Sequence, residues 1–496
     1  MKRFRGLFLS CLLLLASLFL LPTYLFAQVI WGPDVRLTDY LRGTAYGPKI
    51  VVSGDTIHVV WYEDWVDTGN IEYIEVMYKR STNRGLNWTA DTILSPLPLG
   101  ASFMPDIAVS GSVVHVAWDE EVGDSVLYTR SSDGGRNWTT PITMTQSGAN
   151  AVIGVSGDTV YVEWGRVYRL SYDGGVTWTV ENQIPRPARF GDRKVQMKSP
   201  FIQLAPQGYP TDTSVIIEVF HQFSSDCGQT WSQPVILSER DKWASQEPSI
   251  AANADSNVYV TWFDFKNSPY LYTGSVFTRL GSNNGNIWDT IQNITTLYRA
   301  KRPDIAVYGD NVHVVWQDDR DAPNPNGLDG FEIYYRYSSD KGNTWGPETR
   351  LTKDTMNSRG PRLAVNDVGV YLVWTDNRNP GRGYEVYFKR GAYARISTED
   401  MRFLFCSDFR VFPNPSQGKV RCCFAFLKPE EWSFDVFDIL GRRVRHYRGF
   451  SASGEVIWDT KDEQGKEVRN GVYIIRFKAL NTAYQQKVII FKGGLE

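Results

Sequence analysis

Carboxylates inside apolar segments are the groups in this 496-residue sequence that are best suited to chemistry. Glu163 lies in "VYVEW" and Glu218 lies in "VIIEVF", where a carboxyl group is expected to be buried. Burial raises the pKa of a carboxyl group unless a partner compensates, and a raised pKa suits a general acid. Glu163 and Glu218 are therefore the candidate catalytic residues. The alternatives are a structural ion pair with a nearby Lys or Arg, or a wrong alignment of the segment around Glu218.

A second set of polar residues follows tryptophan at a fixed spacing. The pattern W-x-D-x-R occurs at Trp316-Asp318-Arg320 and again at Trp374-Asp376-Arg378. Because the pattern recurs, a structural ion pair explains it better than a binding site does. If these segments bind a ligand instead, the candidate residues are Asp64, Asp119, Asp264, Asp318, Arg320, Asp376 and Arg378.

The acidic segment "DDRDAPNPNGLDG" at 318–330 carries oxygen atoms of the kind that Ca²⁺ prefers. Its spacing does not match an EF-hand, so we expect a solvated loop. The alternative is a structural Ca²⁺ site, and no other cofactor is expected to be required. The metal candidates are Asp318, Asp319, Asp321 and Asp329. The motifs HExxH and GxSxG and the phosphate-binding loop are not present in the sequence.

The elements that position these residues are indicated by a repeat. The pattern S-x-D-x-G-x-x-W, as in "SSDGGRNW" at 131–138, occurs six times, twice in degenerate form. Its Asp can accept backbone N–H bonds, its Gly allows a positive φ, and its Trp can pack between neighbouring units. Asn replaces Asp in two copies, which favours a structural role. The residues are Asn83, Asp133, Asp173, Asp226, Asn283 and Asp340, followed by Trp88, Trp138, Trp178, Trp231, Trp288 and Trp345.

Each copy belongs to a unit of roughly 50 residues with four strand-like segments, which is typical of a β-propeller blade. Seven apolar runs open these units, and in this alignment Glu163 and Glu218 both fall in second strands. The segment "WGPDVRLT" at 31–38 repeats "WGPETRLT" at 345–352, so we expect the N-terminal segment to complete the last blade. The prediction is seven blades, with six as the alternative. The runs begin at Pro48, Pro105, Ala151, Pro200, Pro248, Pro303 and Pro361.

The repeated pattern resembles the Asp-box of sialidases and related propellers. The resemblance implies an all-β, sialidase-like propeller whose ligand site lies on the face opposite the Asp-boxes. A sialidase would also need three arginines, a Tyr nucleophile with its Glu partner, and an Asp acid. Lys49 stands where the first arginine is expected, and Arg302, Arg359 and Arg362 do not complete the set. Two functions stay open: binding of glycan or protein without turnover, and glycoside hydrolysis, either sialidase-like or polysaccharide-cleaving.

The two ends of the chain differ from the propeller predicted for residues 28–390. Residues 1–27 have the basic and apolar segments of a secretory signal peptide. Residues 391–408 form a predicted linker, and alternating segments at 409–496 indicate a small immunoglobulin-like β-sandwich. The spaced motifs Pro413-Asn414-Pro415, Trp458-Asp459 and Gly471-Val472-Tyr473 resemble the sorting domain of type IX secretion cargo. The resemblance implies a secreted or cell-surface protein that contacts outer-membrane secretion machinery.

Charge and cysteine content limit the remaining classes. The formal net charge of −2 gives no basis for nucleic-acid binding, and we expect a monomer. Cys406 could form a disulfide with Cys422 or with Cys423, and the sequence leaves this open.

Overall fold

The computed structural model describes residues 29–491 apart from 39–42, 67–71, 96–99, 122, 186–189, 211–215, 267, 271–272, 323–329, 354–355, 380–382, 394–409, 413–415, 417 and 480–481. The predicted signal peptide lies outside the described residues, as do Cys406 and the side chains of Cys422 and Cys423. All of the described regular structure is β-strand.

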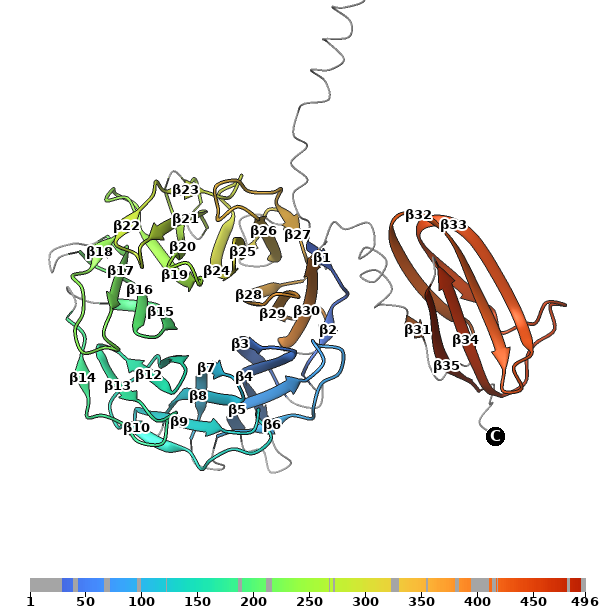
Figure 1. The fold of residues 1–496 in the computed structure, drawn as a ribbon, viewed down its shortest axis with the longest axis horizontal. Coiled ribbons are helices and arrows are strands. Elements are labelled where there is room, and N and C mark those ends of the chain that lie inside the picture. The colour runs from blue at the N-terminus through green and yellow to red at the C-terminus, as the bar shows by residue number, and fades with distance from the viewer. Residues whose placement is uncertain are drawn as a thin grey trace, which may run out of the picture. The chain divides into compact units, whose positions relative to one another are not determined.

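Seven antiparallel sheets form the blades of a propeller (Figure 1). Blades 1 and 2 contain β3 (Ala45–Ser53), β4 (Thr56–Val66), β5 (Glu72–Ser81) and β6 (Thr92–Ile93), then β7 (Ser102–Ser110), β8 (Val113–Glu120), β9 (Ser125–Ser131) and β10 (Ile142–Thr145). Blades 3 and 4 contain β11 (Val152–Ser156), β12 (Thr159–Trp164), β13 (Val167–Ser171) and β14 (Asn182–Gln183), then β15 (Phe190–Lys198), β16 (Phe201–Gly208), β17 (Glu218–Ser224) and β18 (Val235–Ile236). Blades 5 and 6 contain β19 (Ser245–Ala252), β20 (Val258–Asp264), β21 (Ser275–Ser282), β22 (Ile287–Trp288) and β23 (Gln292–Asn293), then β24 (Ala300–Tyr308), β25 (Asn311–Asp318), β26 (Glu332–Ser338) and β27 (Thr349–Arg350).

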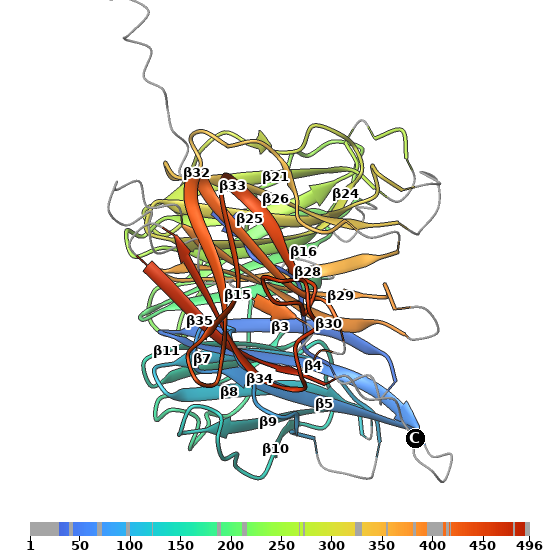
Figure 2. The same cartoon turned by 90° about the vertical axis from the view of Figure 1, so that its right-hand side faces the viewer.

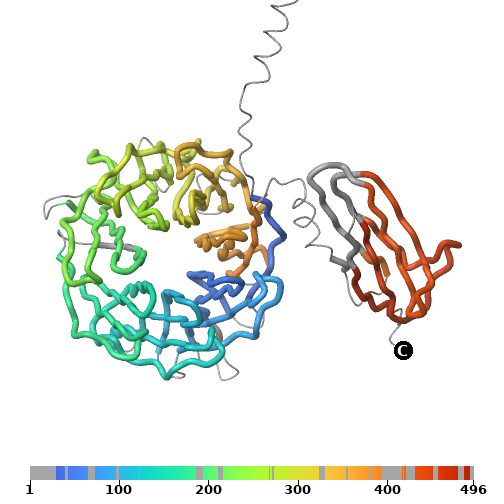
Figure 3. Tube along the Cα trace, in the orientation of Figure 1, coloured from blue at the N-terminus to red at the C-terminus, as the bar shows by residue number. Residues whose placement is uncertain are grey.

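The seventh blade joins the two ends of the propeller sequence. It contains β28 (Ser358–Val365), β29 (Gly369–Asp376) and β30 (Glu385–Tyr393), to which β1 (Val29–Trp31) and β2 (Val35–Arg36) pair. Val29 pairs with Tyr393, and the Leu37 amide donates to the Val386 carbonyl at 2.8 Å. Figure 3 shows the blue N-terminal segment beside the orange last blade. The predictions of seven blades and of closure by the N-terminal segment are confirmed.

Apolar faces of neighbouring blades pack together and form the core. The strand β25, "NVHVVWQD", is buried along almost its whole length, because a middle strand has a neighbouring blade on each side. One core cluster joins Val60 and Tyr78 of blade 1 to Val116 and Trp118 of blade 2. In the view turned by 90°, the strands run along the axis of the ring (Figure 2).

The box turns hold each blade to the one before it. In the second blade, the Asp133 Oδ1 atom accepts the Asn137 amide at 2.9 Å, and the Ser131 hydroxyl donates to the same atom at 2.8 Å. The Trp138 ring packs edge-on against Tyr78 of the first blade, with ring centroids 4.8 Å apart. These contacts give the box a structural role that needs no reacting group.

Blade 4 corrects the predicted alignment. The segment that begins at Pro200 supplies the second strand, β16, whereas the first strand is β15 at Phe190–Lys198. Glu218 consequently lies at the start of the third strand and pairs with Gly208. The apolar run "FIQLA" resembles the first strands of the other units, and "FGDRKVQMK" contains too many charges to be recognised as one.

The C-terminal residues form a separate antiparallel sheet. It contains β31 (Arg410–Phe412), β32 (Val420–Asp438), β33 (Arg443–Trp458), β34 (Gly471–Ala479) and β35 (Thr482–Ile490). The register of β32 and β33 shifts between Ala425 and Glu430, so both halves of these strands contribute to one core around Trp458 and Phe434.

Candidate functional site

A cavity of about 350 Å³ lies at the centre of the propeller and is lined by the first strands of all seven blades. Each first strand contacts the next one, and β28 contacts β3, which completes the ring. Ligand pockets range from roughly 300 to 1,000 Å³. The cavity therefore has room for a small group rather than for a whole polymer chain.

Charged residues form one layer of this channel. Lys49, Asp106, Lys194 and Asp304 pair with Val60, Ala117, Ala205 and Val315, which occupy equivalent positions in their second strands. Apolar residues follow them along each first strand. In five blades the layer residue is the first of the residues that line the cavity, so the layer lies at the end of the cavity toward the loops between second and third strands. Its seven positions are Lys49, Asp106, Val152, Lys194, Ser249, Asp304 and Arg362.

Both carboxylates of the layer form an ion pair and accept hydrogen bonds. The Lys49 Nζ atom lies 3.5 Å from Asp106 Oδ1, and Asp106 Oδ2 accepts the Ile153 amide at 3.0 Å. Lys194 pairs with Asp304, which also accepts the Ser249 hydroxyl at 2.8 Å and the Leu363 amide at 2.8 Å. The charges of Lys194 and Arg362 hold the pKa of Asp304 below its usual value, so Asp304 is not suited to donate a proton.

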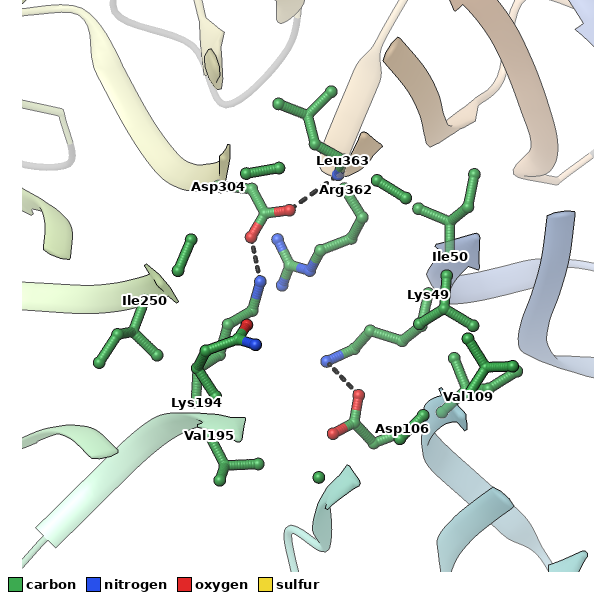
Figure 4. A pocket seen from close by; sticks show the side chains of 18 of the residues that line it. Lys49, Ile50, Asp106, Val109, Lys194, Val195, Ile250, Asp304, Arg362 and Leu363 are labelled. Atoms are coloured by element: carbon green, nitrogen blue, oxygen red, sulfur yellow. Dashed lines mark hydrogen bonds and ion pairs between the residues drawn. The ribbon is translucent and has the colours of Figure 1, made fainter. Parts of the chain in front are cut away.

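Arg362 is the cation of this layer that forms no salt bridge among the described residues. Its Nη1 atom donates to the Pro361 carbonyl at 2.9 Å, and its buried Nε atom has no hydrogen-bond partner. Figure 4 shows the Arg362, Lys194 and Lys49 side chains pointing toward one another inside the channel. The layer therefore contains three basic and two acidic side chains.

Burial and neighbouring charges both shift pKa values in the layer. Burial lowers the pKa of Lys194 to about 8, and the charges of Arg362 and Lys49 act in the same direction against Asp304. Burial would raise the pKa of Asp304, but the charges of Lys194 and Arg362 outweigh it and hold that pKa below its usual value.

Bulges shape the mouth of the channel on the loop face. The register of four first strands shifts at the residue before proline, and that residue has a positive φ. It is Gly47 in blade 1, but Met104, Glu247 and Arg302 in blades 2, 5 and 6, with φ of 51°, 52° and 51°. Bulges turn side chains in new directions, and strained non-glycine residues cluster at functional sites. Met104 is 49% exposed at this rim.

An aromatic pair lies beside the same rim. The rings of Tyr46 and Tyr62 stack with centroids 5.3 Å apart, and both residues are half-buried. Burial, Tyr46 and Asp64 raise the pKa of Tyr62, while the nearby charge of Arg302 lowers it. The Arg302 amide donates to the Glu247 carboxylate at 2.8 Å. Aromatic rings and hydrogen-bonding groups thus occur together at the channel mouth.

Three of the predicted ligand residues bond the backbone or side chains of nearby strands. Asp119 accepts the amides of Asn150 and Ala151 at 2.6 and 3.0 Å, which fixes the start of β11. Asp264 accepts the Ser245 hydroxyl at 2.7 Å, and Asp64 accepts the amide of Thr44. These three aspartates therefore bond other residues of the propeller itself.

The W-x-D-x-R pattern forms an ion pair in both blades. The Asp318 carboxylate accepts the Trp316 indole N–H at 3.0 Å and pairs with Arg320 at 2.6 Å. Asp376 accepts the Trp374 indole N–H at 2.9 Å and pairs with Arg378 at 2.6 Å. The arginines also lie over Tyr334 and Tyr387, with 4.3 Å from each guanidinium carbon to the ring centroid. A structural role accounts for all of these contacts.

Of the two candidate catalytic carboxylates, one belongs to the repeated pattern of the blades and the other departs from it. Glu163 lies in β12, is fully buried and accepts the Tyr161 hydroxyl at 2.7 Å. Glu218 accepts the Ser238 hydroxyl at 2.5 Å, and burial raises its pKa to about 7. The third strands of blades 1 and 6 contain the same arrangement, in Glu75 with Ser95 and in Glu332 with Thr352. Glu218 is therefore a recurring residue of the blade, and Glu163 is the exception to the repeat.

The acidic residues proposed as Ca²⁺ ligands form ion pairs and hydrogen bonds with other side chains. Asp319 lies 3.6 Å from Arg299, and Asp321 bonds the Tyr334 hydroxyl and lies 3.1 Å from Arg350. Asp329 lies outside the described residues. The part of the chain that the structure describes contains no group of three or more His, Cys, Asp or Glu placed to hold a metal ion.

Sequence reasoning missed Lys194 and Asp106, and it proposed Asp319 only as a metal ligand. Burial raises the pKa of Asp319 to about 6, and its buried Oδ1 atom has no hydrogen-bond partner. Lys194 was hidden by the wrong alignment of blade 4. The alternation of charge at the position after proline, in "PKI", "PDI" and "PRL", is the signal that could have revealed the layer.

The topology defines a seven-bladed β-propeller with a charged central channel. Residues 410–491 match the family model of the secretion system C-terminal sorting domain. The protein is therefore directed to secretion, either to the outer cell surface or for release. Among the described residues, no helix is long and apolar enough to cross a membrane.

Comparison with known proteins gives distant likenesses. No curated protein matches the chain. A protein of unknown function from Dyadobacter fermentans is 14% identical, with a TM-score of 0.49, over 74% of this chain and 99% of that one. A Hadza microbial sialidase is 16% identical, with a TM-score of 0.44, over 73% and 68%. A polysaccharide lyase described as an ulvan lyase is 9% identical, with a TM-score of 0.48, over 71% and 95%.

Proposed function

We propose that this exported propeller binds glycans at the loop-face mouth of its central channel, without cleaving them. The observation that carries the proposal is the stacked pair Tyr46 and Tyr62 beside Arg302 at the rim of a cavity large enough for one sugar residue. Rigid aromatic rings with a polar neighbour give large contact area at low entropic cost. A protein ligand is the alternative occupant of the same mouth.

The charged layer supports binding over hydrolysis. Glycoside hydrolysis uses two carboxyl groups across one cleft, of which one must be protonated to donate to the leaving oxygen. Asp106 and Asp304 both pair with lysines and accept backbone amides, and the pKa of Asp304 is held below its usual value by Lys194 and Arg362. A channel with this arrangement can hold a ligand but lacks an acid at its base.

A glycan array probed with the exported full-length chain tests the proposal. We expect binding to at least one glycan class, and Tyr62→Ala to weaken it by about tenfold or more, or about 1.4 kcal/mol. Tyr172→Ala is the matched control, because Tyr172 is 51% exposed in a box turn on the opposite face. Binding of no glycan, or equal loss in both variants, would contradict the proposal. Binding to a protein alone would favour the alternative ligand.

Glycoside hydrolysis, sialidase-like or polysaccharide-cleaving, is the second candidate function. Asp319 favours it, because a buried carboxyl group with a pKa of about 6 suits proton donation on the loop face. Glu163, the other unusual buried carboxylate, is the second residue to test. Turnover of any glycoside or polysaccharide that Asp319→Asn or Glu163→Gln abolishes, with folding unchanged, would replace the binding proposal.

A further inference from the structure

We infer that the C-terminal unit carries a surface that binds an anionic lipid membrane, formed by an exposed apolar patch with arginines beside it. The proposed glycan site lies in the propeller and uses none of these residues, so the two proposals can fail independently. We call the apolar residues the end patch, because they gather at one end of the C-terminal sheet. They are Phe437, Ile439, Leu440, Ile474, Ile489 and Phe491.

The end patch lies on the face of the C-terminal sheet that is opposite its core. Ile474 of β34 is 38% exposed, whereas Tyr473 and Ile475 on either side of it are buried in the core. Ile489 of β35 is likewise 39% exposed between two core residues. Side chains alternate between the two faces of a strand, so Ile474 and Ile489 share the outer face. Phe437 pairs with Ile474 in the register, which continues the patch onto β32.

The turn after β32 adds two strongly exposed apolar side chains. Ile439 and Leu440 are 71% and 72% exposed. The turn is held by Asp438, whose Oδ1 atom accepts the amides of Leu440 and Arg442 at 3.0 and 2.9 Å. The register of β32, β34 and β35 places Phe491, which is 52% exposed, at the same end of the sheet. Exposed apolar patches of this kind mark sites of protein or membrane binding.

The charge of the C-terminal unit favours an anionic partner. Residues 410–491 contain 14 Lys and Arg residues and 9 Asp and Glu residues, which gives a formal charge of +5, although the whole chain has a formal charge of −2. The rest of the chain is therefore net negative. Basic residues near a membrane surface are attracted to anionic lipids, so this attraction is confined to the C-terminal unit.

Exposed arginines lie directly beside the end patch. Arg442 and Arg443 follow the turn and are 75% and 58% exposed. Their acidic partners, Asp438 and Asp435, are only 18% and 8% exposed. The guanidinium groups are thus the charges that face solvent next to the turn.

Two further cations flank the patch on the sheet. The Arg476 guanidinium lies over a ring of the patch, 4.5 Å from its centroid, and Lys487 pairs with Ile474 in the register. The nearby loop 459–470 contains three basic and four acidic residues, and Arg445, which bonds this loop, offsets the difference. Cations therefore outnumber anions around the patch.

This arrangement fits a lipid surface rather than a protein pocket. Ile439 and Leu440 lie on a turn at the end of the sheet, so they can enter the boundary between headgroups and acyl chains while the strands stay outside. Arginines beside them can bond the phosphate oxygens of the headgroups. The match of this unit to a sorting domain directs the chain to the outer cell surface or to release, which brings it to a membrane.

Sedimentation with lipid vesicles tests the inference on the chain without its predicted signal peptide, because the apolar residues 1–27 would bind lipid themselves. One set of vesicles is phosphatidylcholine alone, and the other is an equal mixture of phosphatidylcholine and phosphatidylglycerol. We expect the chain to bind the anionic vesicles and not the neutral ones. Replacing both turn residues, Ile439→Ser with Leu440→Ser, should weaken this binding at least tenfold.

The matched control is Val176→Ser with Val180→Ser. It also removes two exposed apolar side chains, which are 57% and 79% exposed in the propeller, and it should leave lipid binding unchanged. Denaturant unfolding should be the same for both double variants and the unaltered chain, because every replaced side chain is more than half exposed.

Salt dependence separates insertion of apolar side chains from attraction between charges. Salt screens the attraction between the arginines and the lipid, but not the burial of apolar side chains. Arg443→Gln should therefore weaken binding about fivefold at low salt and reduce its dependence on salt. Asp435 keeps its bond to His446 in that variant. The Ile439→Ser and Leu440→Ser double variant should bind more weakly at every salt concentration, with an unchanged salt dependence.

The outcomes are separable from those of the glycan array. Equal lipid binding by the turn variant and the unaltered chain would overturn the inference, as would equal binding to both kinds of vesicle or binding to neither. Binding to a purified outer-membrane protein through Ile439 and Leu440, without binding to vesicles, would reject the lipid surface in favour of a protein partner. Lipid binding by a chain that binds no glycan would keep this inference and reject the glycan proposal, and glycan binding without lipid binding would do the reverse.

Discussion

The hydroxyl of Tyr78 occupies the space in which Gly135 of the next blade would need a side chain. A Cβ atom added to Gly135 would lie 1.8 Å from the Tyr78 oxygen, and Gly135 has a φ of +80°. Blade 3 repeats the arrangement with Gly175 and Tyr128, at 1.9 Å. The glycine of the box is thus required by the neighbouring blade as well as by its own turn.

Gly135→Ala should destabilise the protein more than Gly134→Ala. Both glycines have positive φ, and an alanine there costs about 1–2 kcal/mol. At Gly134 the nearest atom to an added Cβ is 3.7 Å away, so only this cost applies. At Gly135 the clash with Tyr78 adds to it, and we expect a total of about 3 kcal/mol or more in the free energy of unfolding. Denaturant unfolding of both variants measures the difference. Equal losses of unfolding free energy would show that the clash with Tyr78 adds nothing to the cost.

Buried histidines should make the propeller sensitive to acid. Burial lowers the pKa of His58 and His115 to about 4, and of His221 and His313 to about 3. Between about pH 6.5 and pH 4 the unfolded chain binds protons that the folded chain excludes, so stability falls as the pH falls through this window. His115→Gln should therefore gain up to about 3 kcal/mol relative to the unaltered chain between pH 7 and pH 4.

The control for this measurement is His446→Gln in the C-terminal unit, where His446 bonds Asp435 and is 31% exposed. We expect its difference from the unaltered chain to show no comparable gain over the same pH range. A stability difference for His115→Gln that is independent of pH would contradict the assignment of a buried neutral histidine.

Glu218→Gln should have the opposite pH dependence. The pKa of Glu218 is raised by burial to about 7, so its contribution to stability is complete below the unfolded value of about 4.5 and is lost as the pH rises through 7. Relative to the unaltered chain, Glu218→Gln should gain about 3 kcal/mol between pH 5 and pH 8. Glu332→Gln is the control, because Arg350 lies 2.7 Å from Glu332 and its loss should cost stability at both pH values.

Asp376→Asn should lower stability without altering ligand binding. The Asp376 carboxylate bonds the Trp374 indole and the Ser358 hydroxyl and pairs with Arg378, all in a buried position. Removing one partner of a buried ion pair costs about 3–5 kcal/mol. Asp55→Asn is the control, because Asp55 is 56% exposed beside Arg84 and such surface pairs contribute about 0–1 kcal/mol. If the Asp376→Asn variant folds but no longer binds glycan, Asp376 belongs to the ligand site.

The sequence was sufficient for the propeller because its signals are local and repeated. Six box turns, alternating strands and the copy of 345–352 at 31–38 each depend on short segments. Blade 4 departed from the prediction where these signals weaken, since its first strand is charged and its second resembles a first. Glu218 looked exceptional only because of that shift, and Lys194 was overlooked for the same reason.

The charged layer could not be predicted in the same way. Lys49 and Arg362 are more than three hundred residues apart in the sequence, and each occupies an ordinary position in its own repeat. Their proximity depends on how seven strands are arranged around one axis, and on which aspartate each cation finds. The excess of one positive charge becomes visible only when Asp106 and Asp304 are seen to have lysine partners.

Because Val29 pairs with Tyr393, the ring can close only after the whole propeller has been synthesised. The strand that closes the ring is the first of the propeller strands to be synthesised, and it has to wait for the last of them. Until β30 has been synthesised, β1 has no partner strand and keeps an unpaired edge of the kind that promotes association between chains. The seventh blade, and with it the ring, can therefore be completed only after all the other propeller strands have been synthesised.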